Sequence, residues 1–156
     1  MKKQLEKIHA CYEAIEWIGD RNLEQAYAEC PRADWLIWYA KRMNVSTQKL
    51  ILASALCVNT VRHLVTEKNL KYLDTAILYG TGQATFEELC KTPAWIMCDI
   101  YINAQVSAAV VYIQLHDGYS AYQAALVSPD FDYALEKMAD IVRSVITLED
   151  LKGGDQ

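Results

Sequence analysis

Apolar residues recur every three or four positions along most of the chain, which is the period of an amphipathic α-helix. Leu5, Ile8, Tyr12 and Ile15 show this spacing near the start. Together with start and stop residues, the period predicts helices over residues 2–18, 22–30, 31–43, 47–65, 69–79, 94–117 and 128–146, with shorter helices after Thr85 and over residues 120–127. No segment of comparable length alternates apolar and polar residues as a strand does. The pattern therefore predicts an all-α protein.

The segment 94–117 differs from the other predicted helices because it is apolar on almost every side. Such a helix needs neighbours that cover it all round. We expect it to be the long, buried central helix of a bundle of about seven to eight helices, which forms a single domain over residues 1–148. Residues 149–156 have few side chains to bury and are expected to form a flexible C-terminal tail.

Polar residues at the starts of several predicted helices have the spacing of helix caps. Asn22 with Gln25, and Thr85 with Glu88, match the capping box, in which two side chains and two backbone N–H groups bond reciprocally. Ser128 precedes a proline and an acidic residue, which suit the first turn of a helix. We therefore expect Ser128 to cap the last helix.

The most aromatic stretch is CPRADWLIWYA, residues 30–40. In a helix that begins near Pro31, Trp35, Trp38 and Arg42 lie on one side. One interpretation places this helix inside the bundle, with the acidic residue Asp34 stabilising its N-terminus. The other makes Trp35, Trp38 and Arg42 an exposed anchor for a partner protein, because Trp and Arg dominate the energetics of protein interfaces.

The longer stretch EWIGDRNLEQAYAECPRADWLIWYAKRMNV, residues 16–45, resembles the N-terminal signature of a family of small helical proteins from bacteria and their phages that are labelled immunity proteins. The matching residues are Arg32, Asp34, Trp35 and Trp38. The resemblance covers about the first third of the chain. It implies a helical protein that neutralises another macromolecule, and it assigns no chemistry.

Polar residues also follow one another inside the apolar segment 94–117. Asp99, Asn103 and Ser107 are four residues apart and would line one face of a helix. Because a charged group in an apolar helix must be paired or hydrated, one interpretation is a hydrogen-bonded seam between buried helices. The alternative is that Asp99 and Asn103 form the polar floor of a small-molecule pocket, which helical bundles often hold between their helices.

The charge of the chain indicates which classes of binding partner are not expected. It has 15 Lys and Arg against 20 Asp and Glu, a formal net charge of −5, and no basic run, so we expect no nucleic-acid binding. The longest uncharged stretch, residues 100–116, is too short for a membrane span and contains polar residues. The N-terminal residues lack the apolar stretch of a secretory signal. We expect a cytoplasmic protein that does not bind membranes.

Motifs for catalysis or for cofactors are missing from the sequence. It contains no HExxH, P-loop, GxGxxG or GxSxG, and its three histidines lie in separate predicted helices. The five cysteines include no CxxC pair, and in the cytosol they are expected to be free thiols. The sequence thus predicts a protein that is not an enzyme and has neither metal nor cofactor.

Three functions of different classes remain open. The favoured one is a non-catalytic protein that binds and neutralises a toxin or a defence component through an acidic and aromatic surface, since negative charge steers association with basic partners. The second is a small-molecule or nucleotide binder, or sponge, that uses Asp99 and Asn103. The third is a structural oligomerisation domain that buries its apolar surface in a homo-oligomer.

Overall fold

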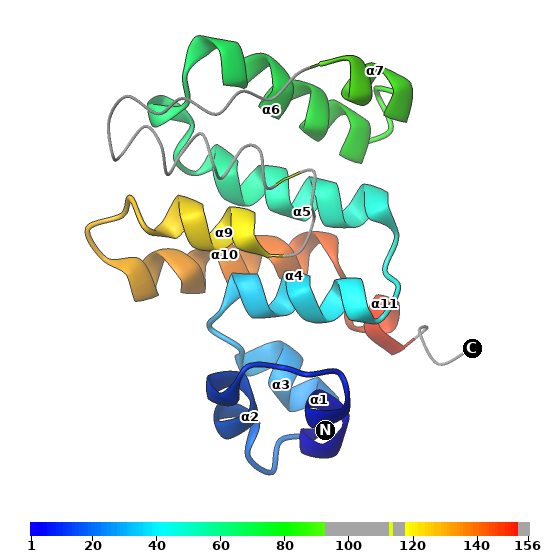
Figure 1. Ribbon diagram of the computed structural model, residues 1–156, viewed down its shortest axis with the longest axis vertical. Helices are drawn as coiled ribbons and strands as arrows, with labels where there is room; N and C mark the ends of the chain where they lie inside the picture. Colours follow the sequence, from blue (N-terminus) through cyan, green and yellow to red (C-terminus); the bar gives the residue numbers. More distant parts are fainter. Residues whose placement is uncertain (93–112, 114–117, 153–156) are drawn as a thin grey trace. The chain divides into compact units, whose positions relative to one another are not determined.

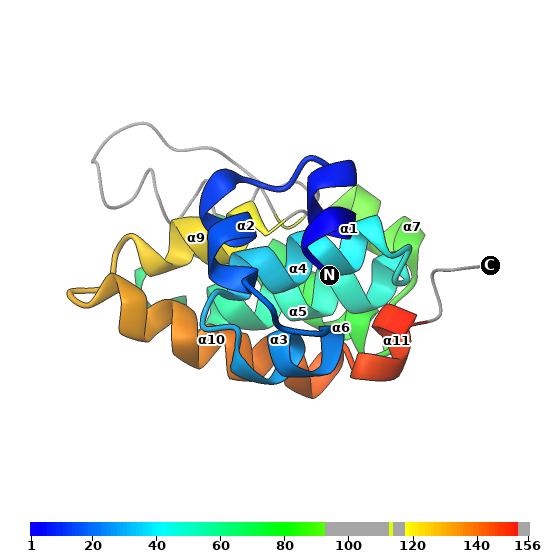
Figure 2. The same ribbon diagram turned by 90° about the horizontal axis from the view of Figure 1, so that it is seen from below.

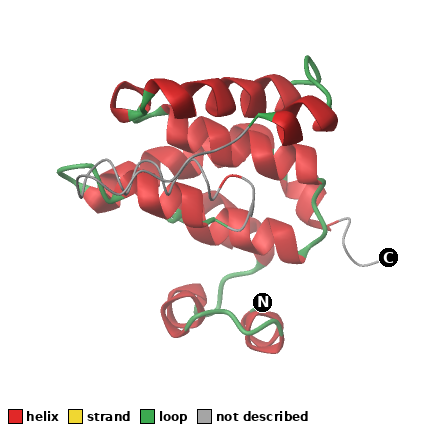
Figure 3. Ribbon diagram, turned by 45° about the horizontal axis from the view of Figure 1, so that its top comes forward, coloured by secondary structure: helices red, strands yellow, loops and turns green. Residues whose placement is uncertain are grey.

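The computed structural model describes residues 1–92, 113 and 118–152. These residues form ten α-helices and one 3-10 helix and contain no strand (Figures 1 and 3). The predicted all-α fold is therefore confirmed. Apart from Ile113, the long helix predicted over 94–117 lies outside the described residues, and so do Asp99, Asn103 and Ser107.

The chain divides into two compact units, Met1–Cys30 and Pro31–Gln156. That residues 1–148 form one domain stays a prediction. Among the described helices, none combines the length and the apolar character needed to cross a membrane.

The first unit contains three short helices, α1 (Lys2–Lys7), α2 (Tyr12–Ile18) and α3 (Leu23–Glu29). The prediction of one helix over 2–18 is wrong, because the chain leaves the helix at His9 with φ of 59°. The N–H of His9 bonds to the carbonyl of Glu6 and that of Ala10 to the carbonyl of Leu5, which completes a Schellman motif with His9 in the left-handed position. The predicted capping box of Asn22 and Gln25 starts α3 and is confirmed.

The second unit contains α4 (Ala33–Arg42), α5 (Thr47–Asn59), the 3-10 helix η1 (Arg62–Leu64), α6 (Glu67–Gly80), α7 (Phe86–Lys91), α9 (Tyr119–Ala125), α10 (Phe131–Val145) and α11 (Leu148–Lys152). Helix α5 packs against α4, α6, α9 and α10. Figure 1 shows it between α6 on one side and α4, α9 and α10 on the other. Its buried residues lie on several sides, namely Leu50, Ile51, Ala53, Ser54, Ala55, Cys57 and Val58.

Several helix boundaries in the second unit differ from the predicted ones, and two of these differences have a clear cause. The helix expected over 47–65 ends at Asn59, where the hydroxyl of Thr60 bonds to the carbonyl of Cys57 at 2.7 Å and the chain continues into η1. The last long helix is capped by Asp130 and not by Ser128, since the Asp130 side chain accepts the N–H of Tyr133 at 3.0 Å. Helices α9 and α10 form an antiparallel hairpin (Figure 2).

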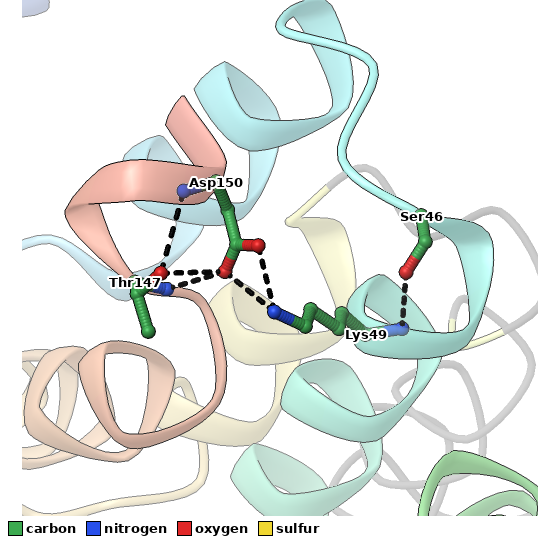
Figure 4. A network of polar contacts seen from close by, with 4 residues as sticks. All are labelled: Ser46, Lys49, Thr147 and Asp150. Carbon is green, nitrogen blue, oxygen red and sulfur yellow. Dashed lines mark hydrogen bonds and ion pairs between the residues drawn. The ribbon is translucent and has the colours of Figure 1, made fainter. Parts of the chain in front are cut away.

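The predicted flexible tail is helical over its first residues, which form most of α11. Thr147 and Asp150 cap this helix reciprocally, with the Asp150 carboxylate accepting the N–H and the hydroxyl of Thr147 at 2.7 and 2.9 Å (Figure 4). The same carboxylate pairs with Lys49 of α5, whose Nζ lies 2.7 Å from both oxygens. Leu151 is buried beside them. Residues that the sequence pattern assigned to a flexible tail are thus fixed by the cap, the ion pair and one buried leucine.

Candidate protein-binding surface

The residues before and within the first turn of α4 form a bidentate ion pair. Arg32 precedes the helix in an extended conformation, and Asp34 lies in its first turn. The guanidinium Nε lies 2.9 Å from Oδ1 of Asp34, and Nη2 lies 2.7 Å from Oδ2. Such parallel bonds fix the plane of the guanidinium as well as its position. Both side chains are partly buried, with 24% of Arg32 and 14% of Asp34 exposed.

Aromatic rings from three helices extend away from this ion pair. The Cζ atom of Arg32 lies 4.7 Å from the ring centroid of Trp35 and 5.9 Å from that of Phe131. The Phe131 ring meets Tyr122 edge to face at 5.3 Å, and Tyr122 lies 6.1 Å from Tyr119. We call Trp35, Arg32, Phe131, Tyr122 and Tyr119 the aromatic strip. It is a continuous row of contacts from α4 through the start of α10 to α9.

The aromatic strip reaches solvent at the hairpin of α9 and α10. Tyr119, the last ring of the strip, is 53% exposed. Trp35, Tyr122 and Phe131 are half-buried. Rings that are packed on one side and open on the other have few conformations before binding, so binding costs them little conformational entropy. The strip is therefore already shaped for contact with another molecule.

The chain segment that carries Phe131, Tyr122 and Tyr119 is negatively charged. Residues 118–136 contain Asp130, Asp132 and Glu136 and no Lys or Arg. Asp130 is occupied as the cap of α10, whereas Asp132 and Glu136 are exposed one turn apart on that helix. Lys137 follows at the edge of this region, with Nζ 5.3 Å from the ring centroid of Tyr133.

Trp38 and Arg42 form a second pair farther along α4. Arg42 is exposed, and its Cζ atom lies 5.3 Å from the ring centroid of Trp38, which is half-buried. The fully buried positions of α4 include Ala33, Ile37 and Ala40 instead. The core of the second unit thus contains the aliphatic residues of this helix and Tyr39, and Trp35 and Trp38 occupy positions intermediate between core and surface. That Arg32, Asp34, Trp35, Trp38 and Arg42 are binding residues stays a prediction.

The carboxylate of Asp34 also affects the pKa of a thiol in the core, that of Cys57. Burial, with a smaller contribution from the negative charge of Asp34, raises the pKa of the Cys57 thiol far above its ordinary value. Cys57 is 0% exposed on α5, and its thiol faces the carbonyl of Met138 at 3.9 Å. A thiol in this state is protonated and is a poor nucleophile or metal ligand. Among the described residues, no group of three or more His, Cys, Asp or Glu could hold a metal ion.

The sequence pattern singled out neither Tyr122 nor Phe131 as a site residue. Their contact depends on the hairpin of α9 and α10, and no local sequence pattern indicates it. The polar positions Asp99 and Asn103 lie outside the described residues, so the seam and pocket interpretations both stay predictions.

Comparisons of the chain with protein-family models, with curated proteins and with solved structures gave no match. The resemblance of residues 16–45 to immunity proteins stays a prediction.

Proposed function

We propose that this chain is a non-catalytic binding protein that neutralises a toxin or a defence component by protein–protein interaction. The aromatic strip is the surface that makes the contact. Asp34, Trp38 and Arg42 adjoin the strip on α4 and extend it. Chemistry on the partner is not part of this function.

The observation that carries the proposal is the continuous row of rings, half-buried along its length and exposed at Tyr119, with an arginine built into it. Trp, Tyr and Arg are the residues that most often dominate binding energy at protein interfaces. In the strip they are packed against one another, with Arg32 fixed by Asp34, so binding needs little rearrangement of the free protein.

The experiment compares two variants with nearly equal exposed aromatic area. Tyr119 in the strip is 53% exposed, and Phe86 on α7 is 55% exposed. Tagged wild-type protein, Tyr119→Ala and Phe86→Ala are used for capture from the host lysate, and each eluate is quantified by mass spectrometry. The proposal predicts one dominant protein that is retained by wild type and by Phe86→Ala and is lost with Tyr119→Ala. Equal capture by all three proteins would contradict it.

A further inference from the structure

The charge around the aromatic strip indicates which kind of partner it fits. From the described start of α9 through the first turns of α10, residues 118–136 carry three carboxylates and no cationic side chain. The one cation of the strip, Arg32, is already in a bidentate pair with Asp34. The chain segment at the open end of the strip is thus both aromatic and negative.

Aromatic faces and carboxylates favour the same kind of ligand group. The negative face of a ring attracts a guanidinium or an ammonium group, and a nearby carboxylate strengthens that attraction. The chain shows this with its own cations, since Arg32 lies over Trp35 and Lys137 lies over Tyr133. A partner's Arg or Lys would find the same two kinds of group on this hairpin, the exposed ring of Tyr119 on α9 and the exposed carboxylates of Asp132 and Glu136 on α10.

We infer that the partner presents a basic segment, in which Arg or Lys alternates with apolar residues, to the aromatic strip and to the carboxylates Asp132 and Glu136. This inference rests on the proposed function and names the chemistry of its partner. The apolar residues contact Phe131, Tyr122 and Tyr119, and the cations contact the exposed rings and the two carboxylates. Charges at the rim of an interface act mainly on the association rate and on its salt dependence, so binding weakens as salt is added.

Two short peptides of equal length serve as probes, one of alternating arginine and leucine and one of alternating glutamate and leucine. Binding is measured by titration calorimetry at low salt, and its site is read from backbone amide shifts in NMR spectra. The first variant combines Asp132→Asn with Glu136→Gln, which keeps side-chain size at two exposed positions. The control combines Glu67→Gln with Glu87→Gln, which removes the same charge from exposed positions on α6 and α7.

The inference predicts that the basic peptide binds and shifts the amides of residues 119–133. We expect the Asp132 and Glu136 variant to bind about fivefold more weakly, because each exposed ion pair contributes about 0.5 kcal/mol. The control should change the affinity less than about twofold. Equal weakening in both variants would overturn the inference, because it would reflect only the net charge of the chain.

The remaining outcomes separate the inference from the proposed function. Tighter binding of the acidic peptide to the strip would overturn the inference and leave the strip as a binding surface. Binding of neither peptide would also overturn the inference, while capture of a protein that is lost with Tyr119→Ala would still support the proposed function. If the basic peptide binds as predicted but Tyr119→Ala captures the same protein as wild type, the proposed function fails instead.

Discussion

The backbone carbonyl of Asp34 lies directly against the α-carbon of Gly118. A β-carbon placed on Gly118 would lie 2.2 Å from that carbonyl oxygen, and Gly118 has φ of 95°. The residue before α9 therefore touches the first turn of α4, at the helix end where the aromatic strip begins. Only glycine fits there, both for the close approach and for the backbone angle.

Gly118→Ala is expected to destabilise the protein by about 3 kcal/mol or more, since the clash with backbone adds to the strain of a positive φ. Gly19→Ala is the control, because Gly19 has φ of 47° but no atom within 4 Å of its β-carbon position. It should cost about 1–2 kcal/mol, from backbone strain alone. Urea unfolding of both variants checks the difference. Equal losses would mean that Asp34 and Gly118 do not touch in solution.

Arg32→Ala should lower the free energy of unfolding by about 2 kcal/mol. The change leaves the mostly buried Asp34 carboxylate without its bidentate partner and removes the cation from the rings of Trp35 and Phe131. Arg42→Ala is the matched control, because Arg42 is exposed and stacks on Trp38 alone among the described contacts. Thermal unfolding should show a loss of no more than about 0.5 kcal/mol for the control. A larger loss for Arg42→Ala would contradict this account of α4.

The attachment of α11 is expected to weaken in acid. Partial burial raises the pKa of Asp150, but the bonds from Lys49 and Thr147 outweigh it and hold that pKa below its ordinary value. Stability from a carboxyl with a depressed pKa is present above the unfolded pKa of about 4 and is lost as the pH falls through the folded pKa. Asp150→Asn should cost about 1 kcal/mol at neutral pH.

That cost should disappear as the pH falls below the folded pKa of Asp150, when both proteins carry an uncharged side chain there. Urea unfolding of wild type and Asp150→Asn across the acid range measures the difference. Asp20→Asn, a change at an exposed carboxylate in the first unit, serves as the comparison. A cost of Asp150→Asn that stays constant with pH would show that Lys49 does not hold the ionised carboxylate.

The thiols of Cys57 and Cys90 should differ widely in reactivity. Burial raises the pKa of Cys57, so its reactive thiolate is scarce at neutral pH, whereas Cys90 is exposed on α7. Iodoacetamide labelling of the folded protein, followed by peptide mass spectrometry, should modify Cys90 and leave Cys57 unmodified until the protein unfolds. Comparable labelling of the two in the folded state would mean that α5 is not buried as described.

The sequence predicted the structure best where the pattern that indicates it lies within a few consecutive residues. Asn22 with Gln25, and Thr85 with Glu88, were recognisable because a capping box depends on four consecutive residues. His9 was missed because its left-handed conformation ends a helix without a glycine. The apolar spacing continues through such a break, so the spacing alone does not predict it.

Only part of the candidate site could be predicted from the sequence, for a related reason. Arg32, Asp34 and Trp35 lie within four consecutive residues, and their helical spacing indicated that they lie close together. Phe131 and Tyr122 join them across about a hundred residues of chain, through the packing of α4, α9 and α10. Long-range contacts of this kind follow from the tertiary fold, and helical periodicity contains no information about them.

The central claim is that the partner covers the aromatic strip, and hydrogen exchange tests it most directly. The captured complex and the free protein are compared by amide exchange and peptide mass spectrometry. The account predicts slower exchange in the complex over residues 31–38 and 119–133, with α6 and α7 unchanged. Slower exchange confined to α6 and α7, with the strip unchanged, would contradict it.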